Sequence, residues 1–321
     1  MIDVLFLVLP DSLLLDLAGP AEAFRLANQR LRHAGRAPAF RMRFVGPLAE
    51  VESSVGLGLA KIEPLPPELP PRCWVVVLGR PGSAPEVLRR QRPWLTARDW
   101  LARVVAPRLD ADDTLLLTVC VGALLAADAG LVGTRCVTTH HELLDELARL
   151  APAAKVQANR VFVEDGPLLS SAGITAGIDL ALHLVTRECG PAIASAVAQV
   201  MVAFTRRGPH DEQRSPLLAH RDHLHPAVHR VQDAVCAAPS ADWSAERLAE
   251  TAHVTPRHLA RLFHRHVKLS PRDYVEHVRR GLARHALAGG ASNADAARLA
   301  GFESPRRLRQ ALKRPGAARA G

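Results

Sequence analysis

The sequence is poor in cysteine and in lysine. Its five cysteines include no Cys-x-x-Cys pair, and arginine carries nearly all of the positive charge. Without closely spaced thiols, the chain has neither the disulfide framework of a small secreted domain nor a metal site built on clustered thiolates. Hydrophobic residues make up 48% of the chain, which excludes a wholly disordered protein.

Long hydrophobic runs are also missing. The opening apolar run, residues 4–9, is far shorter than the roughly 20 residues that a membrane-spanning helix needs. No basic segment precedes it, as a signal peptide would require. We therefore expect a cytoplasmic protein with no membrane partner.

The positive charge is confined to one part of the chain. Residues 239–321 contain 16 Lys and Arg against 7 Asp and Glu, whereas residues 1–238 contain 25 of each. The whole net charge of +9 therefore belongs to the last 83 residues. A concentrated basic segment suits a polyanion, because neutralised phosphates release their counterions. An ordinary solvated surface would give the same charge, so charge alone does not decide.

The first two hundred residues alternate short apolar runs with longer amphipathic stretches. This alternation predicts an α/β domain with a mostly parallel, flavodoxin-like sheet covered by helices on both faces. The expected strands are residues 4–9, 40–45, 74–78 and 115–119, and the expected helices are 16–32, 85–105, 122–129, 140–150, 174–188 and 191–206.

A change of composition marks a domain boundary. Residues 206–221 are polar and contain Gly-Pro and Ser-Pro pairs, which is typical of a linker. We expect an N-terminal domain over residues 1–205 and a C-terminal domain over residues 222–321. Neither a metal nor another cofactor is expected, because no carboxylate or cysteine is suitably spaced from the boundary histidines. These are His220, His223, His225 and His229.

The C-terminal segment contains an internal repeat and no strand pattern. Residues 255–265 recur at 304–314, and each copy opens with a hydroxyl residue followed by proline. That pair is a strong signal for the start of a helix. A short helix is predicted just before each copy, at residues 244–252 and 293–300, and a long helix from residue 270 to 287 separates the two pairs. This arrangement predicts an all-α domain with two helix-turn-helix motifs.

Each repeated helix is predicted to have one apolar and one basic face. At about 100° per residue, leucines gather on one side and long donor side chains on the other. Arginine can bind guanine and glutamine can bind adenine in the major groove, while further arginines hold phosphates. The predicted DNA-contacting residues are Arg257, His258, Arg261 and Arg265 in the first copy, and Arg306, Arg307, Gln310 and Lys313 in the second.

This segment resembles the AraC/XylS-type DNA-binding domain. The resemblance is carried by residues 244–249, 255–263, 270–275 and 296–304. It implies that the partner is double-stranded DNA and that the two recognition helices enter successive major grooves. The family continues after the second recognition helix with a Ser-Pro helix, which the residues after Lys313 do not match. The resemblance places Arg257 and Arg261 of the first motif, and Arg306, Arg307 and Gln310 of the second, against bases. The missing helix leaves two alternatives for the second motif, base reading or mainly phosphate contacts.

In the N-terminal part, the apolar run 115–119 leads directly into Cys120 and a following helix. A strand-to-helix turn of this kind presents its side chain beside a helix N-terminus, which lowers the pKa of a thiol. Asp16 and Glu22 follow the first predicted strand. They are expected to approach Cys120 if the two strands are neighbours.

These features resemble the PfpI-like, class I glutamine amidotransferase-like fold. The residues that carry the match are 15–24, 119–123, 137–140 and 171–179. A domain of this kind ahead of an AraC-type module resembles the GlxA-type transcriptional regulators. The resemblance implies a sequence-specific, DNA-binding regulator that forms a homodimer and is controlled by a small-molecule effector.

The chemistry of the related enzymes does not transfer to this chain. Hydrolytic members place His after the cysteine and isonitrile hydratases place Thr there, whereas this chain has Val121, which cannot move a proton. We expect no catalytic residues, and a ligand pocket formed by Asp16, Glu22, Cys120, Val121 and His140.

Three alternatives stay open. In the first, Cys120 is purely structural. In the second, the chain is a cysteine-dependent hydratase or amidase fused to a DNA-binding module. In the third, the basic segment binds nucleic acid without sequence preference.

Overall fold

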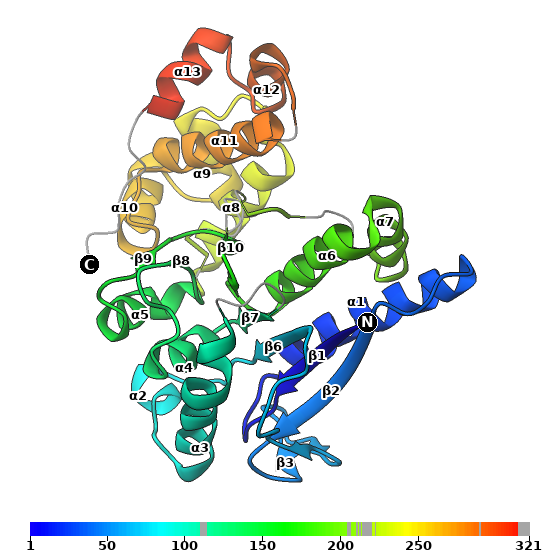
Figure 1. The fold of residues 1–321 in the computed structure, drawn as a ribbon. Helices are drawn as coiled ribbons and strands as arrows, with labels where there is room; N and C mark the ends of the chain where they lie inside the picture. The colour runs from blue at the N-terminus through cyan, green and yellow to red at the C-terminus, as the bar shows by residue number, and fades with distance from the viewer. Residues whose placement is uncertain are drawn as a thin grey trace. The chain divides into compact units, whose positions relative to one another are not determined.

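The computed structural model describes residues 1–109, 114–203, 207–209, 211, 213, 220–221, 223–288 and 290–313 (Figure 1). The chain divides into two compact units, Met1–Gln213 and Arg214–Gly321. Each unit is taken by itself below. Most of the predicted linker, residues 206–221, lies outside the described residues, and the predicted domain limits stay predictions.

A seven-stranded sheet forms the centre of the first unit, in the order β10-β11-β7-β6-β1-β2-β5. Neighbouring strands are parallel except for the antiparallel pair β10 and β11. The expected mostly parallel α/β architecture is therefore confirmed. The strands are β1 (Ile2–Leu7), β2 (Phe40–Gly46), β5 (Glu63–Pro64), β6 (Cys73–Val77), β7 (Thr114–Val119), β10 (Phe162–Asp165) and β11 (Leu168–Ser171), with two small separate pairs, β3 (Val51–Glu52) with β4 (Gly58–Leu59) and β8 (Cys136–Val137) with β9 (Lys155–Val156).

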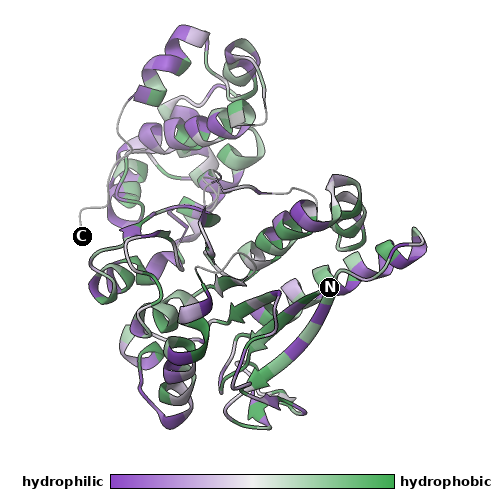
Figure 2. Cartoon of the chain, in the orientation of Figure 1, coloured by the Kyte–Doolittle hydropathy of each residue, from purple (hydrophilic) through white to green (hydrophobic). Residues whose placement is uncertain are grey.

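The central strands are apolar because helices cover both of their faces. Every residue of β1 and β6 is buried, as the strands of a parallel sheet require. Figure 2 shows the strands at the centre of this unit mostly in green, the hydrophobic end of its scale. Figure 1 shows α1, α6 and α7 on one side of the sheet and α2 to α5 on the other. These helices are α1 (Leu14–His33), α2 (Ala84–Val87), α3 (Arg92–Trp100), α4 (Gly122–Asp128), α5 (Leu144–Leu150), α6 (Thr175–Cys189) and α7 (Pro191–Val200).

The prediction of one continuous helix over residues 85–105 is wrong, because the chain forms two helices there. The chain forms α2, leaves the helical path, and starts α3 at Arg92, with a proline within its first two positions. Proline at the start of a helix fits a fixed backbone angle and lacks a donor that would go unused there. The helical path then continues through a π-helical turn, Leu101–Val105.

The hairpin of β10 and β11 was not predicted from the sequence. Its turn contains Gly166 in the left-handed region at φ 61°, which glycine adopts without steric cost. Because β11 pairs with β7, the hairpin brings the chain after Ser171 beside the end of β7. The functional site of the first unit is built at that point.

Among its described residues, the second unit has helices joined by short turns and no strand. The expected hydroxyl caps of the two repeat copies are confirmed, because the side chains of Thr255 and Ser304 each accept a hydrogen bond from the backbone three residues on. Ser244 and Ser292 accept the same bond at the starts of two further helices. Its helices are α8 (Pro226–Ala237), α9 (Ala245–Ala252), α10 (Pro256–His266), α11 (Pro271–Ala288), α12 (Asn293–Leu299) and α13 (Pro305–Lys313).

Two separate cores hold these helices. The larger core joins α8, α9, α10 and the first part of α11 around large side chains such as Phe263 and Tyr274. The smaller core joins the end of α11 to α12 and α13, and its buried members are four alanines and Leu308. No helix among the described residues is both long enough and apolar enough to cross a membrane.

Phe263→Ala should lower the free energy of unfolding of the helical unit by about 3–5 kcal/mol, because it leaves a cavity in the larger core. Phe263 is completely buried. Urea unfolding followed by the fluorescence of Trp243, which packs against this core, measures the change. Leu299 is 59% exposed, so Leu299→Ala should change the value by less than about 0.5 kcal/mol. Equal losses in the two variants would show that Phe263 does not anchor the core.

Candidate nucleic-acid interface and ligand site

Helices α9 and α10 form a helix-turn-helix. α9 ends at His253, whose backbone is left-handed at φ 55°, and α10 begins after the capping residue Thr255. Leu248 of α9 packs with Leu259 and Phe263 of α10 in the larger core. Burial of these apolar side chains fixes the angle between the helices and turns the opposite face of α10 to solvent.

The outer face of α10 carries the residues predicted to contact DNA. Arg257, His258, Arg261 and Arg265 are all exposed, whereas Leu259, Leu262 and Phe263 are buried. Among the described residues, Arg257, Arg261 and Arg265 form no ion pair with an acidic side chain. Their guanidinium groups are thus available to an external anion. Contact with DNA remains a prediction.

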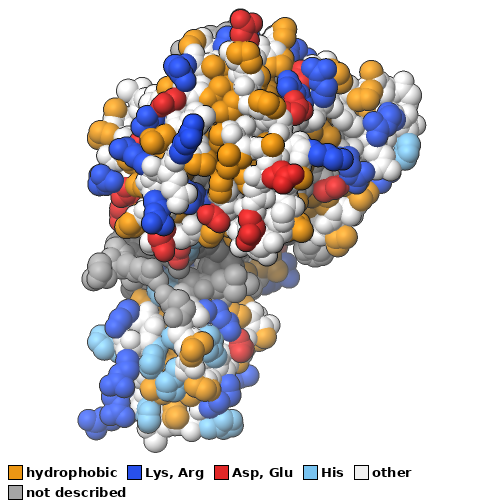
Figure 3. Space-filling model, turned by 90° about the horizontal axis from the view of Figure 1, so that it is seen from below, with side chains coloured by type: hydrophobic (Ala, Val, Ile, Leu, Met, Phe, Trp, Pro, Cys, Tyr) orange, Lys and Arg blue, Asp and Glu red, His pale blue; other side chains and the backbone are white. Residues whose placement is uncertain are grey.

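Helix α13 repeats this arrangement on the smaller core. Leu308 and Ala311 are buried. The predicted residues Arg306, Arg307, Gln310 and Lys313 are exposed, and so is Arg309, which the sequence reasoning left out. Arg307 is partly engaged, since its Nε lies 3.9 Å from Oε2 of Glu303. In Figure 3, the smaller, helical unit shows many Lys, Arg and His side chains on its surface and few acidic ones.

The turn before α13 is held close to the first motif. Gly301 has φ 75°, and a Cβ atom there would lie 2.5 Å from Cα of Ser240. Arg279 of α11 donates hydrogen bonds to the carbonyl oxygens of Pro239 and Ala241 at 2.8 and 2.7 Å. These contacts tie the loop before α9 to the long helix. They therefore fix the placement of the two motifs within this unit.

In the first unit, Cys120 occupies a tight turn between β7 and α4. Its backbone is left-handed at φ 55°, a strained conformation for a residue with a side chain. Two hydrogen bonds hold it, one from its N–H to the carbonyl oxygen of Ser171 and one from Thr139 Oγ1 to its own carbonyl oxygen. A Cβ atom on Gly173 would lie 2.6 Å from the Cys120 Sγ atom. The thiol is therefore enclosed by backbone.

Asp16 of α1 lies beside this turn. Its Oδ1 accepts a hydrogen bond from Ile174 N at 2.9 Å, and its Oδ2 accepts one from Gly79 N at 3.2 Å. The side chain is fully buried, and burial raises the pKa of Asp16 to about 6 despite these two hydrogen bonds. A carboxyl group that titrates close to neutral pH is typical of functional sites.

The expected low thiol pKa is wrong. Burial raises the pKa of Cys120 well above its ordinary value, and the neighbouring Asp16 carboxylate raises it further. The backbone N–H of Val121 at the start of α4 lowers the pKa only in part. A thiol in this setting stays protonated at neutral pH and is a poor nucleophile.

The other predicted pocket residues differ in how far they are exposed to solvent. Val121 is buried at the start of α4. His140 is partly exposed and faces Glu142, with 3.6 Å between Nδ1 and Oε2. Glu22 was wrongly placed in the pocket, because it is exposed and pairs with Arg25 at 2.6 Å. It lies six residues after Asp16, on the outward side of α1.

Sequence reasoning missed the residues that surround the thiol. Gly79 directly follows the apolar run ending at Leu78, and a Cβ atom there would lie 2.7 Å from both Asp16 Oδ2 and Cys120 Cβ. Glycine at the end of a buried strand signals such a close approach. Thr139 takes part through its side-chain hydroxyl and Ile174 through its backbone N–H, and residue type alone does not indicate either contact.

Comparison with known proteins agrees with this division. A helix-turn-helix domain model matches residues 248–315. The HTH-type transcriptional regulator CdhR of Pseudomonas aeruginosa is 31% identical over 221 residues, which is 68% of this chain and 63% of that protein. The HTH-type transcriptional regulator GlxA of Rhizobium meliloti is 29% identical over 194 residues, which is 60% of each. The chain thus spans about three fifths of the length of these relatives.

Solved structures share the fold of the first unit. An AraC family transcriptional regulator from Pseudomonas putida has a TM-score of 0.51 at 21% identity, over 63% of this chain and 100% of that chain. A ThiJ/PfpI family protein from Pseudomonas syringae has a TM-score of 0.50 at 21% identity, over 78% and 88% of the two chains. The expected PfpI-like fold is confirmed.

These findings define the class of the protein. The second unit is a helix-turn-helix domain of the AraC type, and it follows a domain with the ThiJ/PfpI fold. The resemblance to GlxA-type transcriptional regulators is thereby confirmed. Both relatives are named as HTH-type transcriptional regulators.

Asp16 should make the stability of the first unit depend on pH. The folded carboxyl keeps its proton up to about pH 6, whereas its ordinary pKa is 3.8. The folded state therefore binds more protons between these values, and the free energy of unfolding falls as pH rises through them. The loss reaches roughly 3 kcal/mol for a shift of this size.

Unfolding in urea at pH 4 and pH 7, followed by the fluorescence of Trp74, Trp94 and Trp100, measures this loss. Asp16→Asn removes the ionisable group, so its free energy of unfolding should change less between the two pH values. If the variant and the wild type show the same pH dependence, Asp16 is not the group responsible.

Proposed function

We propose that the protein is a cytoplasmic, DNA-binding transcriptional regulator that acts as a homodimer and responds to a small-molecule effector. The observation that carries the DNA-binding part is the exposed face of α10. Three arginines stand on this face with no acidic partner in the described part of the chain, and a buried apolar face lies behind them. The helix also belongs to the matched helix-turn-helix domain. The domain limits we propose are residues 1–205 and 222–321, joined by a linker at 206–221.

The two recognition helices have different tasks in this proposal. α10 lies on the larger core and supplies base contacts through Arg257 and Arg261. α13 lies on a small alanine core, and its face carries arginines and one lysine around Gln310. That face holds the phosphates and adds affinity for any sequence.

The effector site lies at the turn around Cys120. Support comes from the buried Asp16 carboxyl, whose pKa is raised to about 6, and from the strained backbone of Cys120 and Ile174. Backbone strain and shifted pKa values gather at functional sites. An effector acts on DNA binding only through a difference in affinity between two arrangements of the dimer.

The enzymatic alternative is disfavoured by the same turn. A hydratase or amidase needs a thiolate and a base, whereas the Cys120 thiol is buried with a raised pKa and is followed by valine. Turnover of amides or isonitriles that Cys120→Ala abolishes would favour the enzyme.

Arg261→Ala should relax discrimination at one base position by about 1–3 kcal/mol, because a bidentate base contact is lost. Fluorescence anisotropy with the DNA upstream of the protein's own gene, with single-base variants of it and with scrambled DNA measures this. Arg25 is an exposed arginine of the first unit, so Arg25→Ala should bind as the wild type does. Equal affinity of the wild type for scrambled DNA at physiological salt would contradict sequence reading.

Arg306→Ala tests the division of labour between the motifs. It should weaken binding to all sequences alike and lower the slope of log affinity against log salt by about one, because one phosphate contact is lost. The measurement is a salt titration of each complex. A change of sequence preference without a change of slope would instead make α13 a base-reading helix.

A further inference from the structure

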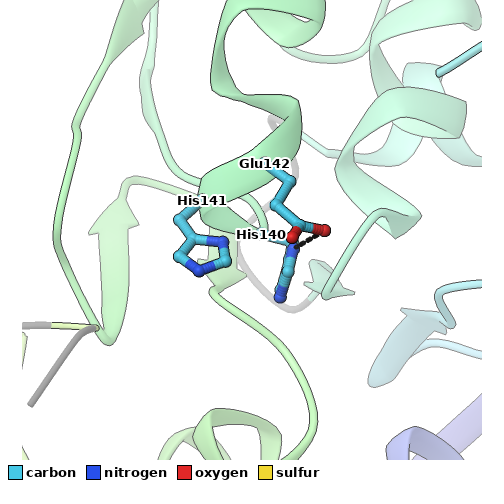
Figure 4. A group of neighbouring side chains, drawn as sticks. All are labelled: His140, His141 and Glu142. Carbon is cyan, nitrogen blue, oxygen red and sulfur yellow. Dashed lines mark ion pairs between the residues drawn. The ribbon is translucent and has the colours of Figure 1, made fainter. Parts of the chain in front are cut away.

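Three consecutive side chains gather at the start of a short 3-10 turn in the first unit. His140 precedes the turn His141–Leu143, which also contains Glu142. One ligand atom from each of the three residues lies within 4.8 Å of the other two. Figure 4 shows all three side chains projecting to one side of the turn, with His140 and Glu142 directed at each other.

The local backbone explains why neighbours in sequence converge here. His140 has a non-helical backbone, at φ −55° and ψ 137°, and the 3-10 turn begins at the next residue. This change of direction leaves Nδ1 of His140 3.6 Å from Oε2 of Glu142, two residues on. The ring of His141 stands nearly perpendicular to that of His140, with 4.4 Å between the centroids.

We propose that His140, His141 and Glu142 bind a divalent transition-metal ion of the zinc type. Imidazole and carboxylate are ligands of Zn²⁺ and Co²⁺, whereas Mg²⁺ and Ca²⁺ prefer oxygen ligands alone. Metal–ligand distances of about 2.0–2.2 Å place two tetrahedral ligands roughly 3.4 Å apart. The 3.6 Å between His140 Nδ1 and Glu142 Oε2 is close to that spacing.

The backbone that carries these ligands is already held in place. Thr138 N donates to Ser170 Oγ at 2.9 Å, and Thr138 Oγ1 donates to the carbonyl oxygen of Gln157 at 2.8 Å. Both Thr138 and Thr139 are fully buried. Ligands on an ordered backbone lose little freedom when the ion binds, which favours affinity.

The site lies next to Thr139, which contacts both the Cys120 turn and the last residue of the first unit. Thr139 donates to the carbonyl oxygen of Cys120, and its own carbonyl oxygen accepts a hydrogen bond from Gln213 Nε2 at 3.0 Å. Gln213 is the last residue of this unit. An ion that orders residues 140–142 therefore steadies the segment between the Cys120 turn and the start of the connection to the helix-turn-helix unit.

The histidines of the second unit do not make an equal site. The rings of His223, His225, His229 and His266 lie near one another, with centroids 4.5 to 5.6 Å apart. Across the described ranges, however, only residues 140–142 bring three possible ligand atoms within 4.8 Å. The sequence alone predicts no metal, and the proposed site at residues 140–142 departs from that expectation.

Calorimetric titration of the full chain with Zn²⁺, and the visible absorption of added Co²⁺, test this proposal. The wild type should bind one equivalent that is lost in His140→Ala and His141→Ala. Glu142→Gln should weaken this site about ten-fold or more, since loss of even an outer partner costs 10–100-fold. It also keeps the shape of the side chain, so it remains decisive if a histidine variant fails to fold.

His183→Ala is the matched control. His183 is a partly exposed histidine of the same unit and lies 2.8 Å from a carboxylate oxygen of Glu164, but it belongs to no group of three converging ligands. It should leave the titration unchanged. Identical titrations for wild type and Glu142→Gln, or an equal loss in His183→Ala, would overturn the proposal. DNA binding measured with a chelator present tests the proposed function separately.

Discussion

The carboxyl group of Asp16 accepts hydrogen bonds from the backbone of Gly79 and Ile174. It thereby joins α1, the end of β6 and the start of α6, which meet around the end of β7. A buried carboxyl is unfavourable unless such donors satisfy it. The close approach requires glycine at positions 79 and 173, where any side chain would meet Asp16 or Cys120. The rest of the site depends on this packing, including the raised pKa of the enclosed thiol.

In the helical unit, too, the buried side chains determine where the functional side chains lie, but here the buried groups are apolar. Apolar side chains bury one face of α10 and of α13, so long cationic side chains are left on the other face. These two outward surfaces carry part of the positive charge of the last 83 residues, namely Arg257, Arg261, Arg265, Arg306, Arg307, Arg309 and Lys313. Arg279 and Gly301 hold the loop before α9 against α11 and against the turn before α13. DNA affinity then follows from placement of charge, and discrimination from which side chains reach the bases.

The sequence predicted those parts of the molecule that rest on periodicity and local signals. Buried strands such as β1 and β6 read as apolar runs, and Ser-Pro or Thr-Pro pairs correctly marked the starts of α10 and α13. The hairpin of β10 and β11 has no long apolar run, and α2 and α3 are separated by a break that periodicity does not reveal. The thiol pKa was misjudged because it depends on desolvation by tertiary packing. Glu22 was misjudged because it lies on the exposed side of α1, where it pairs with Arg25 one turn further on. The convergence of His140 with Glu142 depends on one residue's backbone angle.

The two cores of the helical unit differ in the size of the side chains that they bury. Around α10 these include Phe263 and Tyr274, whereas around α13 they are four alanines and Leu308. Hydrophobic stabilisation grows with apolar area removed from water, so α12 and α13 are held less strongly than α9 and α10. Local opening with partial loss of hydrogen-exchange protection belongs to such weakly packed segments. Any ligand that binds the folded form of the second motif alone would therefore also stabilise the packing of α12 and α13.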